Sequence, residues 1–320
     1  MNGESELMEF PYLSNWYVED EEIQKFKDAT YREFVKLCKN EDGIIEMNSL
    51  LNSEWMLRTY CASKMIMAAT LLLNSAEYSI EKNLLITVPY LQYYAMFCAA
   101  RAFLYVCPYR NTSDIPNLMV TSHEKVLNTT YNEIKNHLNK KLAEKIEKML
   151  FTLKGQRELF SYKFPATGIQ ELVDYEDVVT YCAILAELTE LESEQIEKVY
   201  KKKILSNSNG DWMILDEDIM KYTFTYFINS EKNKVLEVFD WDDYYRVARH
   251  CKYPQAIIRT ITDGMTEYFF GAWAKNEDDT EDIFNPDDNW QRIFLFHRKE
   301  RKNNKFQIED WHKLQYCAEC

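Results

Sequence analysis

The sequence predicts an all-α fold, and two features of its composition support that prediction. The 320 residues include only 7 Gly and 7 Pro, too few for the many turns of a β-sandwich or a β-barrel. Long segments carry Leu, Glu, Lys, Ala and Met, which favour helices, and their apolar residues recur at helical spacing. Because single hydrophobic cores stop growing near about 250–300 residues, the length indicates a helical bundle followed by a second, mostly helical unit.

The first half of the chain is predicted to form a bundle behind an acidic, aromatic lead-in at its N-terminus. Thr121 and Glu124 have the spacing of a capping box, which predicts the start of one helix. Pro108 breaks the helical pattern that precedes it. The apolar spacing places helices over residues 22–39, 53–75, 83–107, 121–138 and 140–153.

The second half is predicted to be helical as well, beyond a boundary at residues 164–168. An acidic loop over residues 276–289 follows its helices, and residues 291–296 are ambiguous between a short strand and a helix. The helices are expected over residues 171–202, 217–227, 241–251 and 255–274. The chain therefore divides into an acidic helical lead-in (1–49), a helical bundle (50–160) and a mostly helical C-terminal unit (161–320).

The formal net charge of −14 argues against a general nucleic-acid binder, because phosphate contacts need concentrated Lys and Arg. Residues 171–197 hold nine acidic side chains and no Lys or Arg, and residues 277–288 hold seven with none. Basic side chains gather over residues 135–154, 198–203 and 298–305. Such runs predict solvated helix faces, and any RNA is expected to bind at the basic ones.

The cysteines and the N-terminus predict a cytoplasmic protein. Eight cysteines are scattered without framework spacing, several of them inside apolar helical patterns, which is typical of reduced thiols. The N-terminus has neither the basic nor the apolar region of a secretory signal. Residues 84–106 are long enough to cross a bilayer, but Pro89, Gln92 and Arg101 indicate a buried core helix, so no membrane partner is expected.

Neither a metal nor a cofactor is predicted. His312, Cys317 and Cys320 near the C-terminus include the Cys-x-x-Cys spacing of half a zinc site. A structural zinc needs a fourth ligand, and none lies nearby in the sequence. The P-loop, GxGxxG, GxSxG and HExxH patterns are absent, so P-loop NTPases, dehydrogenases, serine hydrolases and zincins have no motif support.

The segment over residues 89–128 is the most informative part of the sequence. Residues 93–104 (YYAMFCAARAFL) combine bulky apolar side chains with small ones that let another helix approach closely, and a polar loop then leads to residues 121–126 (TSHEKV). This pattern resembles the HEPN superfamily (higher eukaryote and prokaryote nucleotide-binding) over roughly residues 50–150. The resemblance implies a small helical bundle, and many HEPN proteins are RNases of defence and toxin systems.

His123 is the first candidate catalytic residue. It follows the expected Thr121 cap, where the free N–H groups and the positive end of a helix favour an anion such as phosphate. A structural hydrogen bond is the alternative role for a histidine at a helix start. Many HEPN RNases carry Arg, four to six residues and then His, and the resemblance implies that such an Arg stabilises the charged transition state while the His acts as acid or base.

The remaining candidates are arginines and a second histidine. Twelve residues separate Arg110 from His123, so the HEPN spacing is absent in the bundle itself. Arg292 and His297, with four residues between them, match that loose spacing in the C-terminal unit. Arg101 either pairs with a buried carboxylate or points into the cleft of the bundle. The candidate catalytic residues are therefore His123, Arg110 and Arg101, with Arg292 and His297 as the alternative pair.

Three functions agree with these observations. The first is a HEPN-like, metal-independent endoribonuclease or RNase-derived effector of a prokaryotic defence or stress system, as the resemblance implies. The second is a non-catalytic helical scaffold that docks a partner, or a second copy of itself, through acidic and aromatic surfaces. The third is an acidic mimic of nucleic acid that occupies a basic protein surface.

Overall fold

The structure is a computed structural model, and it confirms the all-α fold class. It describes residues 10–15, 18–110, 122–168, 171–206, 243, 245–247 and 252–273. Within these ranges the only pairing of extended backbone is an isolated antiparallel bridge between Lys39 and Ile45. The expected helix over residues 217–227, the acidic loop over 276–289 and the ambiguous segment over 291–296 lie outside the described residues.

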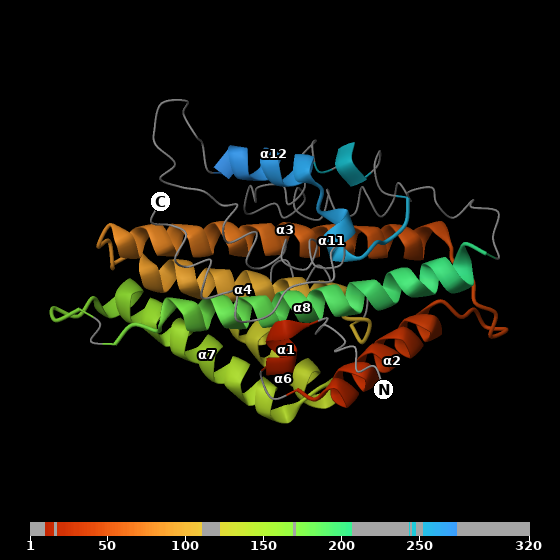
Figure 1. Ribbon diagram of the computed structural model, residues 1–320, viewed down its shortest axis with the longest axis horizontal. Coiled ribbons are helices and arrows are strands. Elements are labelled where there is room, and N and C mark those ends of the chain that lie inside the picture. The colour runs from red at the N-terminus through yellow and green to blue at the C-terminus, as the bar shows by residue number, and fades with distance from the viewer. Residues whose placement is uncertain are drawn as a thin grey trace, which may run out of the picture.

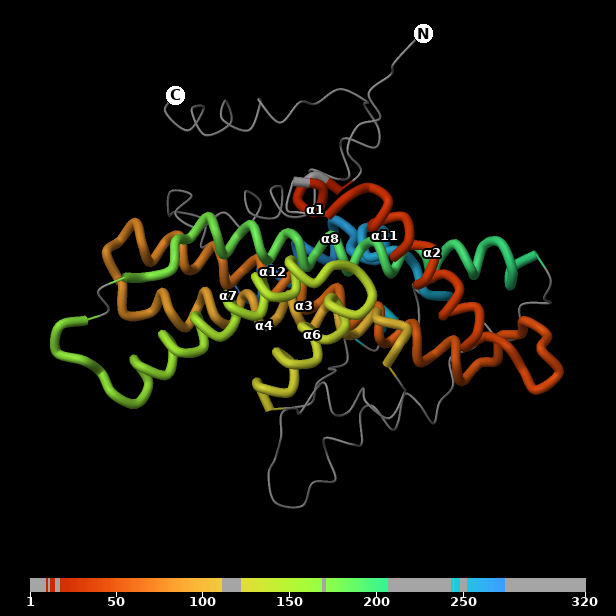
Figure 2. Tube along the Cα trace, turned by 90° about the horizontal axis from the view of Figure 1, so that it is seen from below, coloured from red at the N-terminus to blue at the C-terminus, as the bar shows by residue number. Residues whose placement is uncertain are grey.

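The described helices are α1 (Pro11–Asn15), α2 (Asp20–Leu37), α3 (Ser49–Glu81), α4 (Val88–Val106), α6 (His123–His137), α7 (Lys140–Glu158), α8 (Tyr175–Val199), α11 (Ile257–Thr260) and α12 (Asp263–Trp273), with π turns η1 (Leu159–Lys163) and η2 (Tyr200–Ile204). The long helices α3, α4 and α8 lie side by side along the long axis of the molecule (Figure 1). Helices α6 and α7 pack against α4, whereas α1 and α2 pack against α8. Helix α11 contacts both α3 and α8, α12 packs on α3, and Figure 2 shows α6 and α7 on the near side of the α3–α4 pair.

Helix α3 is longer at both ends than the apolar spacing over residues 53–75 predicts, because polar caps define its ends. Asn48 is the N-cap, and its side-chain oxygen accepts a hydrogen bond from the N–H of Leu51 at 2.8 Å. At the other end Asn83 adopts a left-handed conformation with φ of +56°, which terminates the helix. Helix α4 then starts at Val88, with Pro89 in its first turn, so residues 83–87 form a turn instead of the expected helix.

The helix expected over residues 255–274 is broken into α11 and α12. The hydroxyl of Thr262 accepts a hydrogen bond from the N–H of Met265 at 3.3 Å, which caps α12 and separates it from α11. Gly264 and Gly271 lie inside α12 and do not cause the break. Of the expected helix over residues 241–251, only Asp243 and residues 245–247 are described, and these are helical.

The acidic run over residues 171–197 is only in part the solvated helix face that its charge predicts. Its first four acidic residues are exposed: Glu171, Asp174, Glu176 and Asp177. Its last five acidic side chains are all buried on α8: Glu187, Glu190, Glu192, Glu194 and Glu197. The carboxylate of Glu187 accepts the N–H groups of Tyr12 and Leu13 at 3.1 and 2.8 Å, which holds α1 on the bundle. The second half of the run is therefore an internal docking face, because its buried carboxylates bond segments that are distant in the sequence.

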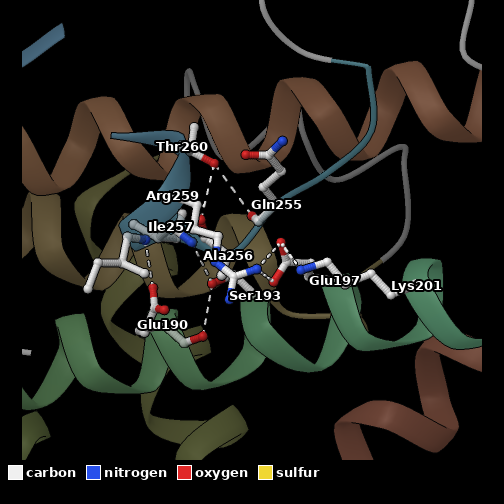
Figure 3. Close-up of polar contacts among 10 residues, drawn as sticks. Glu190, Ser193, Glu197, Lys201, Gln255, Ala256, Ile257, Arg259 and Thr260 are labelled. Atoms are coloured by element: carbon white, nitrogen blue, oxygen red, sulfur yellow. Dashed lines mark hydrogen bonds and ion pairs between the residues drawn. The ribbon is translucent and has the colours of Figure 1, made fainter. Parts of the chain in front are cut away.

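The same face of α8 holds α11 (Figure 3). Glu190 accepts the N–H of Ile258 at 2.9 Å, and the hydroxyl of Ser193 accepts the N–H of Ile257 at 3.0 Å. These two side chains act as an N-cap supplied by another helix, since the first N–H groups of a helix have no partner within it. One turn further along, both carboxylate oxygens of Glu197 accept hydrogen bonds from Arg259 at 2.8 Å.

Arg58 fixes the C-terminal end of α4 from inside the bundle. Its side chain is 1% exposed and donates hydrogen bonds to the carbonyls of Tyr105, Cys107 and Arg110 at 2.8, 3.1 and 3.2 Å. The last carbonyls of a helix have no donor within it. One guanidinium therefore supplies hydrogen-bond donors to carbonyl oxygens that would otherwise be buried without any. An ion pair with Glu54 at 3.1 Å compensates the buried charge.

Candidate functional site

His123 is the first residue of α6, and the structure places it against α4 and α7. Ser122 is the N-cap of α6 and makes no side-chain capping bond, while the expected cap Thr121 lies outside the described residues. The side chain of His123 is partly exposed. Because α6 packs on both α4 and α7, the imidazole can meet side chains from three helices.

Aromatic rings of α4 hold the imidazole. The hydroxyl of Tyr93 lies 2.7 Å from Nδ1 of His123, and which of the two donates depends on the tautomer of the ring. Burial raises the pKa of Tyr93, so its hydroxyl keeps its proton. The rings of Phe97 and Tyr94 lie with their centroids 4.6 and 5.8 Å from that of His123. Nδ1 is hydrogen-bonded to Tyr93. Nε2 has no hydrogen-bond partner within the described ranges, so it is available to bind a ligand.

Cations from two helices act electrostatically on this histidine. Arg157 of α7 donates a hydrogen bond to the hydroxyl of Tyr94 at 3.3 Å, and its guanidinium lies 4.9 Å from the centre of the Tyr93 ring. Partial burial lowers the pKa of His123, and the charges of Arg157, Lys154 and Arg101 lower it further. The neutral form of the imidazole is therefore favoured, although the carboxylate of Glu158 opposes the cations.

Arg101 belongs to this group of cations. Its guanidinium donates to the hydroxyl of Tyr105 at 3.0 Å, and it lies 5.8 Å from the ring centres of both Phe97 and Tyr105. The structure thus gives Arg101 a tyrosine partner in place of the buried carboxylate that we considered. The positive charge of Arg101 contributes to the lowering of the pKa of His123.

Arg110 is directed elsewhere. It forms an ion pair with Glu133 at 2.6 Å, and Glu133 also lies 3.4 Å from His137. The ring of His137 stacks on Tyr109 with centroids 3.7 Å apart. Burial raises the pKa of Glu133, but its bonds with His137 and Arg110 outweigh burial and hold that pKa below its usual value. Arg110 thus serves a separate ion-pair cluster and is not brought to His123.

The sequence did not point to Arg157 and Lys154. They follow His123 by more than thirty residues, so no short motif connects them with it. The available signal was helical spacing: the two cations are three residues apart on α7, and they therefore share one face of that helix. The alternative pair, Arg292 and His297, lies outside the described residues, as do His312, Cys317 and Cys320.

The described ranges hold neither a metal-binding cluster nor a membrane-spanning helix. No three His, Cys, Asp or Glu side chains gather there into a group that could hold a metal ion. Among the same residues, no helix is both long enough and apolar enough to cross a bilayer. No protein family, curated protein or solved structure matches the chain.

Proposed function

We propose that this chain is a HEPN-like, metal-independent endoribonuclease in which His123 is the acid–base group. One observation carries the proposal: a partly exposed imidazole, held by Tyr93, has a pKa that its partial burial and the charges of Arg157, Lys154 and Arg101 lower, so that its neutral form is favoured. Phosphodiester cleavage needs this combination, because a base must take a proton while positive charge stabilises the phosphate in the transition state. The resemblance of residues 50–150 to HEPN proteins supports the same activity.

The chemistry follows from the protonation state of His123. Nε2 takes the proton of a ribose 2′-hydroxyl, the 2′ oxygen attacks the adjacent phosphorus, and the bond from phosphorus to the 5′ oxygen breaks. The 5′ oxygen takes a proton from water as it leaves, and the other product is a 2′,3′-cyclic phosphate. Arg157, Arg101 and Lys154 neutralise the charge that develops on the phosphate. DNA lacks the 2′-hydroxyl and is not cleaved by this route.

The test is incubation of the purified chain with total RNA and with a tRNA pool in the presence of a chelator. We expect cleavage by the wild type, a loss of roughly 10²–10⁴-fold for His123→Ala and roughly 10²–10³-fold for Arg157→Ala. His137→Ala, on the same helix but in the Arg110 cluster, is the matched control and retains activity. The variant His297→Ala tests the alternative pair, since loss in that variant alone moves the active site to the C-terminal unit.

A non-catalytic scaffold is the second candidate. The turn between α3 and α4 exposes Leu84, Leu85 and Ile86 to solvent by 44–49%, which is unusual for three consecutive large apolar side chains. Such a patch favours docking of a protein or of a second copy of the chain. Intact RNA with the wild type and all four variants, together with a concentration-dependent dimer that Leu85→Glu disrupts, would establish the scaffold in place of the RNase. The free thiols of all five described cysteines support a cytoplasmic location in either case.

A further inference from the structure

Helix α7 ends in an unusual turn that displays two aromatic rings. After Glu158 the helix widens into the π turn η1, and Phe164 then adopts a left-handed conformation with φ of +40°. The N–H of Phe164 donates to the carbonyl of Leu159 at 2.9 Å and closes the turn. Tyr162 is 79% exposed and Phe164 is 64% exposed. A bulky residue with positive φ is strained, and both π turns and such strain concentrate at functional sites.

The turn is fixed to the helix that carries the aromatic side of the His123 site. Arg157 bonds the hydroxyl of Tyr94, and one turn further on the hydroxyl of Ser161 donates to that of Tyr90 at 2.8 Å. Helices α7 and α4 are therefore antiparallel where these two hydrogen bonds join them. Tyr162 directly follows Ser161, so the turn η1 carries its ring about one helical turn beyond Arg157 along the same segment.

Cations accompany the rings along this path. Lys163 is exposed between Tyr162 and Phe164, and Lys154 lies 5.8 Å from the ring centre of Phe151, which is itself 37% exposed. Glu158 is the local acidic group, and it is paired with Lys154 and Arg157 at 3.9 and 3.4 Å. Exposed aromatic rings between cations are what single-stranded nucleic acid binds, since bases stack on the rings and phosphates meet the cations.

We propose that Tyr162 and Phe164 form a stacking platform for bases of single-stranded RNA, while the adjoining phosphate lies against Arg157 and Lys154 beside His123. This inference rests on the proposed function and names its substrate class. Duplex RNA cannot use the platform, because its bases are stacked on each other and its grooves present sugar and phosphate. The chain therefore cleaves single-stranded segments in preference to helices.

The experiment measures binding in the full-length His123→Ala protein, which cannot consume its ligand. The probe is a fluorescein-labelled 12-nucleotide single-stranded RNA, with the same sequence as a duplex for comparison. Replacing both rings, in Tyr162→Ala/Phe164→Ala, weakens single-strand binding by about 5- to 100-fold for each ring that stacks a base and leaves duplex binding unchanged. Tyr162→Phe/Phe164→Tyr keeps the rings and restores binding.

Phe164→Gly separates recognition from folding. Glycine adopts positive φ without strain, and a Cβ-free residue keeps the turn, so this variant is at least as stable as the parent protein yet binds the single strand more weakly. Unchanged binding after loss of both rings overturns the platform and leaves the RNase proposal standing. No binding and no cleavage by any form overturns both. A dimer that dissociates when the rings are removed, with RNA binding unaffected, assigns the rings to a protein contact instead.

Discussion

At the scale of single residues, the ionisation of His123 is set by its neighbours. Partial burial and the charges of Arg157, Lys154 and Arg101 hold its pKa below the usual 6.5. The neutral form, which acts as the base, therefore becomes dominant as the pH rises through a value below 6.5. We expect an NMR titration of the His123 ring to have its midpoint there, and we expect Arg157→Ala to move the midpoint upward because a positive neighbour is removed.

Lys148→Ala is the control for this titration. Lys148 is exposed on α7, and its charge is not among those that shift His123. It should leave the midpoint unchanged. A midpoint at or above 6.5 in the wild type would contradict the local positive field, and with it the electrostatic basis of the proposed site.

Glu192 is the second residue whose ionisation has a consequence. Its side chain is fully buried on α8, where the thiol of Cys107 and the charge of Arg58 are the groups that favour its ionised form. Burial raises its pKa well above the usual value, the nearby charge of Glu133 adds to this, and Arg58 opposes it. The folded state therefore holds a proton that the unfolded state loses above its own pKa of about 4.5.

The raised pKa of Glu192 makes the free energy of unfolding depend on pH. Between the unfolded and the folded pKa the native state binds more protons, so this residue makes the protein less stable as the pH rises, by about 1.4 kcal/mol per pH unit. Glu192→Gln removes the titration. We expect the variant to match the wild type below pH 4.5 and to have a larger free energy of unfolding at pH 7, as measured by urea denaturation at several pH values. Glu171→Gln, an exposed position, is the control and should follow the wild type at every pH.

At the scale of elements, α8 organises segments that are distant in the sequence. Its buried acidic side chains cap or pair the starts of α1 and, as Figure 3 shows, of α11 instead of facing solvent. Short helices such as these are unstable alone, because nucleation fixes several residues for each hydrogen bond gained. Both α1 and α11 therefore depend on acceptors that α8 supplies.

The double variant Glu190→Gln/Ser193→Ala tests this dependence at α11. The N–H groups of Ile257 and Ile258 lose their acceptors or keep a weaker one, which costs about 0.5–2 kcal/mol per cap. We expect amide exchange in α11 to accelerate roughly 2- to 30-fold, with α3 and α4 unchanged, in hydrogen-exchange mass spectrometry. Equal acceleration throughout the bundle would show that the contact supports the whole fold and not α11 in particular.

Apolar spacing predicted which segments are helical, but polar details decided where the helices end and which side chains meet. Asn48, Asn83 and Thr262 set boundaries through single side-chain bonds or a left-handed residue, which an apolar pattern does not report. His123 could be selected as a candidate because its position at a helix start has a chemical meaning in the sequence. Arg157 was missed, because only the packing of α7 on α4 and α6 brings it to the histidine.

At the scale of the whole molecule, one hydrophobic core runs through all three divisions that the sequence predicts. It includes Leu13 of the lead-in, Trp55 and Phe103 of the bundle, and Leu188 and Ile257 beyond it. The ring of Phe34 meets that of Trp55 edge to face at 4.9 Å, so α2 and α3 share this core directly. Loss of any one helix would expose apolar surface on its neighbours.

This continuity predicts a single cooperative unfolding transition for the described helices, although chains above about 150 residues often unfold through intermediates. The buried hydrogen bonds of Glu187 with Leu13 and of Tyr60 with Asp243 connect elements from different divisions, so none of the divisions retains its partners once another unfolds. We expect the calorimetric and van't Hoff enthalpies to agree, and circular dichroism to follow the same transition. Arg58→Ala should lower the free energy of unfolding by roughly 3–5 kcal/mol and shift the whole transition, because it leaves Glu54 buried without its cation. Two resolved transitions, with only one of them sensitive to Arg58→Ala, would mean that the divisions fold independently despite their shared core.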